Sequence, residues 1–555
     1  MVLIPVTTAA GDAMQCDLKL TGGSVVDGSG GPAFEADVAV SGDRILAIGD
    51  LSDVEAQRTI DCRGKTITPG FIDIHSHADW LLIDPDHHGL VEAFVRQGMT
   101  TVVGGNCGFS PAPVSETNLG GIKEASRLIV DAPVAPRWQT MAEFLDAVDE
   151  VGPALNLAEL VGHGSVRAAV TGSLRPDPPN KDELAQMERL AREALDAGCI
   201  GISTGLGYPP GIFAEHDELA AFASWAAASG KLFTSHVKAY SWASGAYQAD
   251  PTEQPHNLLA IREILDAARA GGARLQVSHL IFVGHNTWPT CEDAIAMIEQ
   301  ARAEGLDVAF DAFPYTAGNT TASVIFPPEL LPHLEQVLAS PEQMEPLRAF
   351  GDATFERIGF HLRDIQIMHA NAQAFDRYDG MFVGDAAEAA GMDIWDFYAR
   401  LVVESHRNAR VLIHKYSGSD EDQRAIETVV SHPLCTVETD TFLTATGHQN
   451  PASYGTFPRV LSTYVARGLL SFEEAVHKMT GASADRIGLG DRGRIAEGAA
   501  ADLVVLDRSA LADTATFDAP ASYPSGIETV IVNGRPVLDD GRYDGEARAG
   551  RVLRA

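Results

Sequence analysis

The sequence predicts an α/β protein: a (β/α)8 TIM barrel, a small β-sandwich domain built from both chain ends, and an insertion late in the barrel. Between about residues 68 and 490, apolar strands alternate with helical runs, which is typical of such a barrel. Short β-like runs separated by glycines occur at both ends of the chain, so we expect the ends to pair. Ionisable residues recur where the barrel strands end, which is where these barrels carry their catalytic groups.

The two chain ends share the same short β-like pattern. Four such runs lie between Asp17 and Ile48, separated by glycines and Gly-Asp pairs that are typical of hairpin turns. The pattern returns at Asp502–Leu506 and around the Asn533-Gly534 turn. Residues 1 to about 15 are expected to form a loose leader. The expected limits are residues 1–67 with 491–555 for the sandwich and 68–490 for the barrel.

Within the barrel, helices lead into strands. A helix over Met187–Leu195 leads to a strand that begins near Ile200, and a helix that begins near Leu258 leads to a strand over Arg274–Val277. The stretch from 327 to 405 is longer than one barrel repeat needs. We therefore expect an insertion or lid within it.

The composition fits a soluble globular protein and excludes two classes of partner. The chain has 555 residues, of which 45% are hydrophobic and 21% charged. Its formal net charge of −35 argues against nucleic acid and against an anionic membrane, because both select a basic surface. We expect a small-molecule substrate and leave a homo-oligomer open.

The cysteines and the first residues predict a cytoplasmic protein. The six cysteines are scattered and form no Cys-x-x-Cys pair, which is typical of reduced thiols rather than of a disulfide framework. The chain start lacks the basic residues and long apolar run of a signal peptide, and no apolar run is long enough to cross a bilayer.

The first candidate site lies at the start of the barrel. Ile72 and Ile74 alternate with Asp73, His75 and His77. In an extended strand, side chains two residues apart point the same way, so the aspartate and the two histidines would share one face. Two neutral imidazoles in this arrangement can bind one metal ion. The alternative is a pair of surface histidines in a loop.

Further strand ends carry side chains of the same chemical types. Cys107 follows an apolar strand, and a thiolate is a strong zinc ligand, although most free cysteines are small buried fillers. His236 and His279 each end a strand in Ser-His and are candidate ligands or hydrogen-bonded core histidines. Asp440 follows the expected last strand, where a carboxylate beside a metal can transfer protons or can simply shape a turn. Glu438, two residues earlier, is a second candidate for that role.

Taken together, these motifs resemble the amidohydrolase superfamily and, within it, the D-aminoacylase (N-acyl-D-amino-acid deacylase) family. The resemblance covers nearly the whole chain. The matching stretches are Pro69–His77, Gly105–Pro113, Val161–Arg167, Ser278-His279, Phe313–Ala317, Tyr454–Leu461 and Gly488–Asp502.

The resemblance implies a zinc-dependent hydrolase that cleaves a carbon–nitrogen (amide) bond with metal-activated water. It implies one or two zinc ions, with Cys107 in the bridging position and Asp440 as the general acid/base. One metal would be held by His75 and His77, and a second, tighter zinc by His236 and His279. The candidate substrate contacts are Tyr315, which matches a family tyrosine, and Tyr208, His163 and Lys238.

The sequence departs from the family at positions that concern the substrate. Family members carry a lysine where this chain has Ile281, and an arginine just before the Tyr-Gly-Thr-Phe-Pro-Arg stretch, where this chain reads Asn450-Pro-Ala-Ser. Those cations are associated with gripping a substrate carboxylate, and an unpaired carboxylate in a closed pocket is costly. The sequence therefore predicts a substrate without a free α-carboxylate, unless Lys238, Arg459 or Lys415 replaces the missing cations.

Three other functions stay open at this point. The same metal centre could open a cyclic amide, lactam or lactone, and analysis of the product separates this from linear amide hydrolysis. A metal-dependent lyase such as a decarboxylase would release carbon dioxide instead of consuming water. A non-catalytic scaffold is disfavoured because all six site residues are of ligand or acid type.

Overall fold

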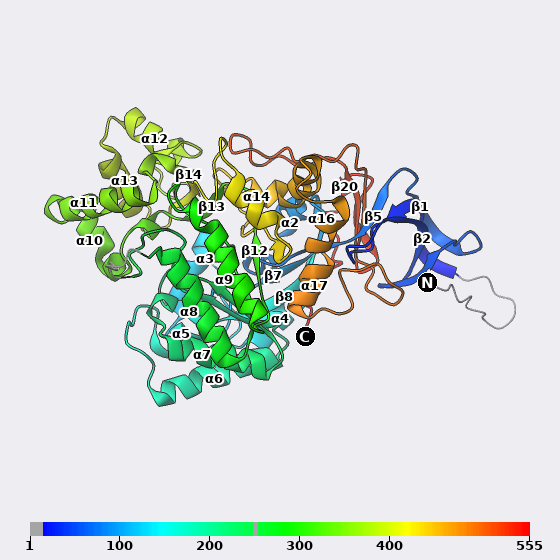
Figure 1. Cartoon of the computed structure of the whole chain (residues 1–555), viewed down its shortest axis with the longest axis horizontal. Helices are drawn as coiled ribbons and strands as arrows, with labels where there is room; N and C mark the ends of the chain where they lie inside the picture. The colour runs from blue at the N-terminus through cyan, green and yellow to red at the C-terminus, as the bar shows by residue number, and fades with distance from the viewer. Residues whose placement is uncertain (1–14, 132–133, 248–253) are drawn as a thin grey trace.

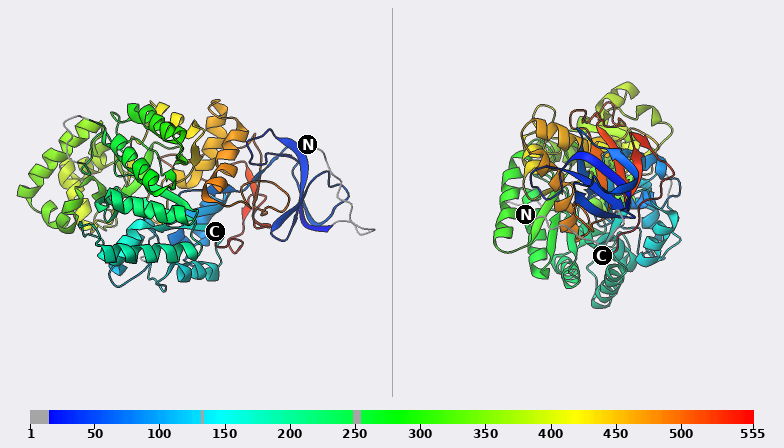
Figure 2. Two further views of the ribbon diagram at one scale, coloured as in Figure 1. Left: turned by 60° about the horizontal axis from the view of Figure 1, so that its bottom comes forward. Right: turned by 90° about the vertical axis from the view of Figure 1, so that its right-hand side faces the viewer.

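A computed structural model describes residues 15–131, 134–247 and 254–555 of the chain. The leader expected over residues 1 to about 15 therefore lies, except for Gln15, outside the described residues. A nine-stranded sheet occupies one end of the molecule, the helices α10 to α13 occupy the other end, and the barrel lies between them (Figures 1 and 2). Within the described ranges, no helix combines the length and the apolar composition needed to span a membrane.

The barrel is an eight-stranded parallel sheet, as the alternating pattern predicts. Its strands pair in the order β16-β12-β11-β10-β9-β8-β7-β6. Just beyond the two outer strands, Asp440 donates its N–H to the His75 carbonyl oxygen at 3.0 Å, and His77 donates its N–H to Thr441 at 3.2 Å. These bonds link the last strand end to the first. The strands are β6 (Phe71–Asp73), β7 (Met99–Gly104), β8 (Asn156–Gly162), β9 (Gly201–Gly205), β10 (Leu232–His236), β11 (Arg274–Val277), β12 (Val308–Ala312) and β16 (Cys435–Val437).

Amphipathic helices cover the outside of the barrel. The helix predicted over Met187–Leu195 lies within α6, which begins at a capping box in which Asn180 and Glu183 bond to each other's backbone N–H groups. The helix predicted from Leu258 lies within α8. The principal barrel helices are α2 (His88–Val95), α4 (Met141–Val151), α5 (His163–Thr171), α6 (Lys181–Asp196), α7 (His216–Ala228), α8 (His256–Gly271), α9 (Cys291–Ala303), α14 (Arg424–Ser431), α15 (Ala452–Arg459), α16 (Phe472–Lys478) and α17 (Gly481–Ile487).

The nine-stranded sheet joins the two chain ends, as predicted. β5 from the N-terminal part pairs antiparallel with β17 from the C-terminal part, and Leu20 and Ile67 share a buried core with Leu503 and Ile531. The expected limits of the two parts stay predictions. The strands are β1 (Gln15–Val25), β2 (Phe34–Ser41), β3 (Arg44–Gly49), β4 (Glu55–Asp61), β5 (Thr66–Pro69), β17 (Leu503–Leu506), β18 (Ile527–Val532), β19 (Arg535–Asp539) and β20 (Arg542–Tyr543).

One detail of this sheet differs from the sequence pattern. The runs predicted as separate strands on either side of Gly22 form the single strand β1, whose pairing with β2 shifts register between Leu20 and Gly23. Gly22 has a φ of 70°, a conformation that suits glycine, so it accommodates an irregularity within the strand instead of ending it.

A large segment separates the barrel strands β12 and β16. We call residues 317–414 the late segment. It contains a three-stranded antiparallel sheet in the order β13-β15-β14 and has its own buried core, in which Phe355 stacks on Trp395. The insertion expected within residues 327–405 falls in this region, and its limits stay a prediction. The elements are β13 (Ala317–Thr321), η3 (Ala322–Ile325), α10 (Leu334–Leu338), α11 (Pro341–Ile358), β14 (Ile365–His369), α12 (Val383–Ala390), α13 (Ile394–Glu404) and β15 (Arg410–His414).

Candidate metal centre

The first histidine pair lies just past a strand, not within it. β6 ends at Asp73, so the prediction that an extended strand carries His75 and His77 is wrong in this detail. Asp73 Oδ1 accepts the N–H groups of His75 at 3.3 Å and of Thr439 at 3.1 Å. Because Thr439 follows the last barrel strand, the Asp73 side chain bonds to a segment that lies far away in the sequence and holds the chain bent before the histidines.

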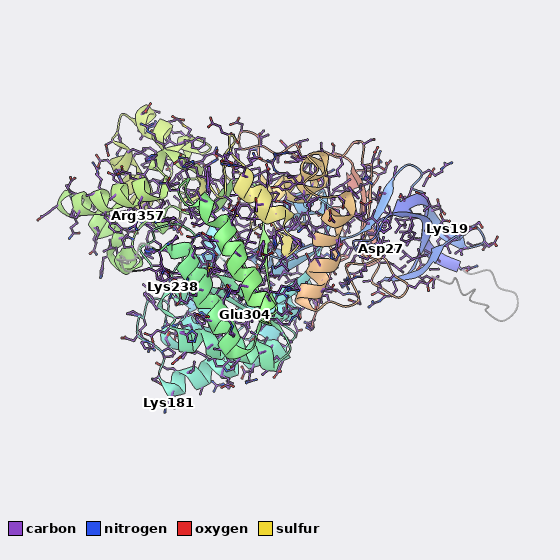
Figure 3. The ribbon with its side chains drawn as sticks, in the orientation of Figure 1. Lys19, Asp27, Lys181, Lys238, Glu304 and Arg357 are labelled. Atoms are coloured by element: carbon purple, nitrogen blue, oxygen red, sulfur yellow. The ribbon has the colours of Figure 1, made fainter. Side chains whose placement is uncertain are left out.

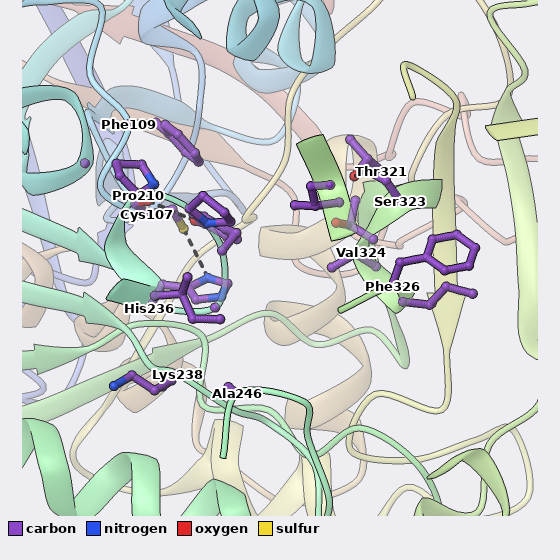
Figure 4. Close-up of a pocket in the computed structure, with 18 of the residues that line it drawn as sticks. Cys107, Phe109, Pro210, His236, Lys238, Ala246, Thr321, Ser323, Val324 and Phe326 are labelled. Carbon is purple, nitrogen blue, oxygen red and sulfur yellow. Dashed lines mark hydrogen bonds between the residues drawn. The ribbon is translucent and has the colours of Figure 1, made fainter. Parts of the chain in front are cut away.

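The predicted sulfur and imidazole groups meet at one end of the barrel. Cys107 Sγ lies 3.2 Å from His75 Nε2 and 3.4 Å from His279 Nε2. It lies 3.6 Å from His236 Nδ1 (Figure 4). His236 Nδ1 and His279 Nε2 are 2.9 Å apart. His75, Cys107 and His279 follow β6, β7 and β11, and His236 is the last residue of β10, so the parallel order of the barrel brings these strand ends together.

Asp440 completes the cluster from the last barrel strand. Its Oδ1 lies 3.4 Å from His75 Nε2 and 3.7 Å from His77 Nε2. One donor atom from each of His75, Cys107, His279 and Asp440 lies within 4.8 Å of the others. Imidazole, thiolate and carboxylate groups are the ligands that zinc takes in proteins, so this donor set fits a zinc ion.

Backbone strain coincides with the cluster. Cys107, His279 and Asp440 have φ values of 54°, 33° and 45°, in a region that non-glycine residues rarely adopt. Such residues persist where the surrounding structure holds them, and they are enriched at functional sites. Gly205 allows one of these conformations to fit, because a Cβ atom on it would lie 2.0 Å from the Cys107 carbonyl oxygen.

The charges within the cluster favour anionic donors. Burial raises the pKa of a thiol, but the positive charges of His75 and His279 outweigh it and hold the pKa of Cys107 well below its usual value. Burial likewise opposes ionisation of Asp440, yet the positive charge of His279 and the nearby imidazoles of His77 and His75 hold the pKa of that carboxyl below its usual value. Both groups are therefore favoured in the deprotonated form that binds a metal.

A second layer of acids supports the cluster. Asp311, at the end of β12, accepts the His279 N–H at 2.6 Å and a hydrogen bond from Gln276 at 2.7 Å. Glu438 is fully buried, and burial raises its pKa well above the usual value. His75, Asp311 and Glu438 also bring donor atoms within 4.8 Å of one another. Asp311 accepts the backbone N–H of His279, so its carboxylate helps to hold that histidine in position within the cluster.

A cavity of about 630 Å³ opens onto the cluster. His77, Cys107, His236, His279 and Asp440 all line it. Its remaining lining is largely aromatic and aliphatic and comes both from the loops after the barrel strands and from the late segment. The volume suits a small organic molecule.

Two of the four candidate substrate contacts line this cavity. Tyr208 does so, and its hydroxyl donates to the Cys107 carbonyl oxygen at 2.8 Å. Lys238 also lines it and lies against α8, where its Nζ is 2.7 Å from Glu263 (Figure 3). His163 is buried and bonded to Glu218 at 2.8 Å, and it is not among the lining residues.

Tyr315 lies away from the cavity. Its hydroxyl donates to Asp513 at 2.8 Å, and the Arg459 guanidinium stacks over its ring at 4.7 Å. Arg459 also forms an ion pair with Asp513 at 3.3 Å, and Lys415 forms one with Asp364 at 2.9 Å. Neither of these two cations lines the cavity.

Several residues around the cluster were not found from the sequence. Tyr240 packs against the rings of both His236 and His279, at 4.9 and 5.1 Å between centroids. Asn319 donates to the Asp440 carbonyl oxygen at 3.3 Å. Arg407 lines the cavity and donates to the Leu331 carbonyl oxygen. Asp311 could have been found in the sequence as an acid at a strand end. Asn319 and Arg407 could not, because no regular spacing in the sequence marks these residues of the late segment.

Known proteins are similar to this chain in sequence and fold. A model of the amidohydrolase family matches residues 58–326 and 435–538. The chain belongs to the amidohydrolase family. It is therefore a hydrolase of amide carbon–nitrogen bonds, as the resemblance implied. The match omits residues 327–434, which include most of the late segment.

Similar full-length relatives are deacylases. An N-acyl-D-glutamate deacylase of Alcaligenes xylosoxydans xylosoxydans is 35% identical over 542 residues, which cover 97% of this chain and 96% of the relative. A D-aminoacylase of the same organism is 34% identical, with 98% of both chains covered. The recognised resemblance to the D-aminoacylase family is thus confirmed.

A solved relative connects the family to zinc. The N-acyl-D-glutamate deacylase of Bordetella bronchiseptica, complexed with zinc and a phosphonate mimic of the tetrahedral intermediate, has a TM-score of 0.79 and 32% identity. The match covers 98% of this chain and 100% of that one. A D-aminoacylase structure described by its binuclear metal centre has the same TM-score and 31% identity. Zinc is accordingly the cofactor of this chain.

Proposed function

We propose that the cluster around Cys107 is the zinc site of this hydrolase and that Asp440 is its proton carrier. The observation that carries the proposal is the convergence of four donor atoms within 4.8 Å of one another, contributed by four separate strand ends. His75 and His77 would hold one ion, His236 and His279 a second, and Cys107 would lie between them. Bound zinc supplies a Lewis acid and an activated water.

The residues of the chain then divide the remaining work. Asp440 takes a proton from the attacking water and delivers it to the departing nitrogen, so that a carbon–oxygen bond forms as the carbon–nitrogen bond breaks. Its position supports this role, because it faces both the cavity and the His77 imidazole. Asn319 holds the Asp440 backbone, and Asn450 in turn holds Asn319 through a 2.6 Å hydrogen bond.

We further propose that the substrate resembles an N-acyl-D-amino acid but has no free α-carboxylate. Ile281 lines the cavity at the position where the family carries a lysine. Among the described lining residues, the lysine and arginine side chains are Lys238 and Arg407, and Lys238 is already paired with Glu263. A carboxylate bound beside Ile281 would lose its hydration without gaining a cation.

Paired substrates test this proposal. N-acyl-D-amino acids and their α-carboxamides should be compared by kcat/KM on the zinc-loaded enzyme, and we expect the carboxamides to be preferred. Ile281→Lys should raise kcat/KM for the free acids by about tenfold to a hundredfold, the value of one charge-assisted hydrogen bond. A strong preference of the unaltered enzyme for free acids would contradict the proposal. Loss of that preference in Arg407→Gln would then identify the cation responsible.

The cellular setting belongs to the same proposal. All six cysteines are free and buried, which supports a reducing compartment, and we propose the cytoplasm. Fractionation of the producing cells tests this location. A homo-oligomer stays a prediction, which light scattering on the purified protein tests.

A further inference from the structure

Exposed apolar side chains gather at the cavity. Among the described residues, six large hydrophobic side chains are exposed, and three of them line this cavity: Leu174 (48% exposed), Val324 (44%) and Phe350 (50%). Single exposed hydrophobic residues are ordinary, but several around one opening indicate a binding surface.

The three side chains come from three separate parts of the chain. Leu174 follows α5 of the barrel, Val324 belongs to η3, and Phe350 lies in α11 of the late segment. Their convergence on one cavity is therefore a product of tertiary folding and not of a local apolar run.

The apolar surface continues inward from this rim to the metal centre. Phe326 and Phe355 of the late segment line the same cavity as Trp80 and Phe109, which follow the first two barrel strands, β6 and β7. In Figure 4, Val324 and Phe326 stand on the wall opposite Phe109, Pro210 and Cys107. An extended apolar group could thus contact hydrocarbon along its whole length while its polar end meets the cluster.

We propose that this cavity binds an amide that carries a large hydrocarbon group, which extends from the metal centre to the rim formed by Leu174, Val324 and Phe350. The inference rests on the proposed function and specifies its substrate class. Burying hydrocarbon is the driving force that such a wall offers, and each buried methylene contributes about 0.8 kcal/mol, or roughly a fourfold change in kcat/KM.

A substrate series tests the proposal on the zinc-loaded enzyme. N-methylacetamide is the short reference, N-methyloctanamide extends the acyl side, and N-octylacetamide extends the amine side. We expect kcat/KM for one of the two long amides to exceed that for N-methylacetamide by at least about tenfold. The long amide with the higher kcat/KM identifies which side of the amide bond contacts the apolar lining of the cavity. Equal rates for all three amides would overturn the inference while leaving the hydrolase assignment intact.

Variants at the rim separate this wall from general effects on the enzyme. Leu174→Gln and Phe350→Gln change exposed side chains, so the fold should tolerate them. We expect each to lower the ratio of kcat/KM for the preferred long amide to kcat/KM for N-methylacetamide by about threefold to tenfold. Phe34→Gln is the matched control, because Phe34 is 42% exposed in β2, outside the cavity. An unchanged ratio of long to short amide in both rim variants would also overturn the inference.

Binding without turnover covers the case in which none of these amides is cleaved. Octanamide and acetamide can be titrated into the enzyme by calorimetry. Tighter binding of octanamide, weakened by Phe350→Gln but not by Phe34→Gln, supports the apolar wall even though the proposed function would then fail for these substrates. Equal binding of both amides would contradict it.

Discussion

The two ends of the cavity differ in chemistry and in origin. Its floor is built from barrel strand ends and concentrates imidazole, thiol and carboxylate groups around Cys107. Its rim is largely apolar and draws Val324 and Phe350 from the late segment. The family match covers the floor but omits residues 327–434, which carry Phe350.

This difference suggests how one scaffold serves different substrates. The floor needs its donor atoms at fixed distances, and rigid parallel strands supply that precision. The rim needs shape and hydrophobicity, which loops and inserted elements can supply without moving the donors. Reaction chemistry and substrate choice should therefore respond to different substitutions.

Removal of zinc should have the largest effect: it should abolish turnover at the metal centre and leave binding at the apolar rim unchanged. A chelator should abolish turnover, and added zinc should restore it, because the donor set lacks its Lewis acid without the ion. Octanamide binding, measured by calorimetry on the metal-free protein, should persist. If the metal-free protein binds no octanamide, the two ends of the cavity are not independent.

Asp440→Asn should have the next largest effect. The amide keeps the shape of the side chain but cannot accept a proton, so kcat should fall by about 10²- to 10⁴-fold. Zinc content, measured by elemental analysis, should stay near that of the unaltered protein, because the proposed ligands are Cys107 and the imidazoles, which this substitution leaves in place. Asp420→Asn, at an exposed acid, is the control and should leave kcat unchanged. Full activity of Asp440→Asn would refute its role as proton carrier.

Gly205→Ala should disturb the floor without removing a ligand. The added Cβ would lie 2.0 Å from the Cys107 carbonyl oxygen and 2.7 Å from the Tyr208 hydroxyl, so Cys107 must move. Misplacement of about 1 Å can cost on the order of a hundredfold in rate, and we expect kcat to fall by about tenfold to a hundredfold. Gly89→Ala, where the new methyl group meets nothing within 4 Å, should be neutral.

His87 should affect stability without affecting either end of the cavity. It accepts the Ala154 N–H on Nε2 and therefore donates from Nδ1 to the Asp84 carbonyl oxygen, so the folded protein needs it neutral. Burial lowers the pKa of His87 to about 4. The pKa of a histidine in the unfolded chain is about 6.5, so the unfolded state takes up a proton at a higher pH than the folded state does. The free energy of unfolding should therefore fall as pH falls from about 6.5 to about 4, by at most about 3 kcal/mol.

Denaturant unfolding across that pH range checks this expectation. His87→Gln should flatten the pH dependence, since the residue that must stay neutral is gone. His216→Gln, at an exposed histidine, should leave the slope unchanged. An identical slope in His87→Gln and the unaltered protein would contradict the assignment.

Most of the barrel could be predicted because its signals are local. Each strand is a short apolar run, and side chains such as Cys107 and His279 follow the runs within a few residues. The parallel order then forces those strand ends together, so positions far apart in sequence could be grouped before any coordinate was known.

What could not be predicted depends on partners distant in sequence. β6 ends early because Asp73 bonds to Thr439, 366 residues away. Tyr315 turns toward Asp513, 198 residues away, although its motif suggested a place near the substrate. From the sequence, the late segment could be recognised only by its excess length, because its sheet pairs β15 with both β13 and β14 across intervening helices.

The zinc content of two cysteine variants tests the central claim most directly. Cys107 and Cys199 are both buried free thiols, but Cys107 lies among three imidazoles, whereas burial raises the pKa of Cys199 well above its usual value. Cys107→Ala should lose bound zinc and turnover while keeping its circular dichroism spectrum, and Cys199→Ala should keep all three. Full zinc and full turnover in Cys107→Ala would contradict the proposed metal centre.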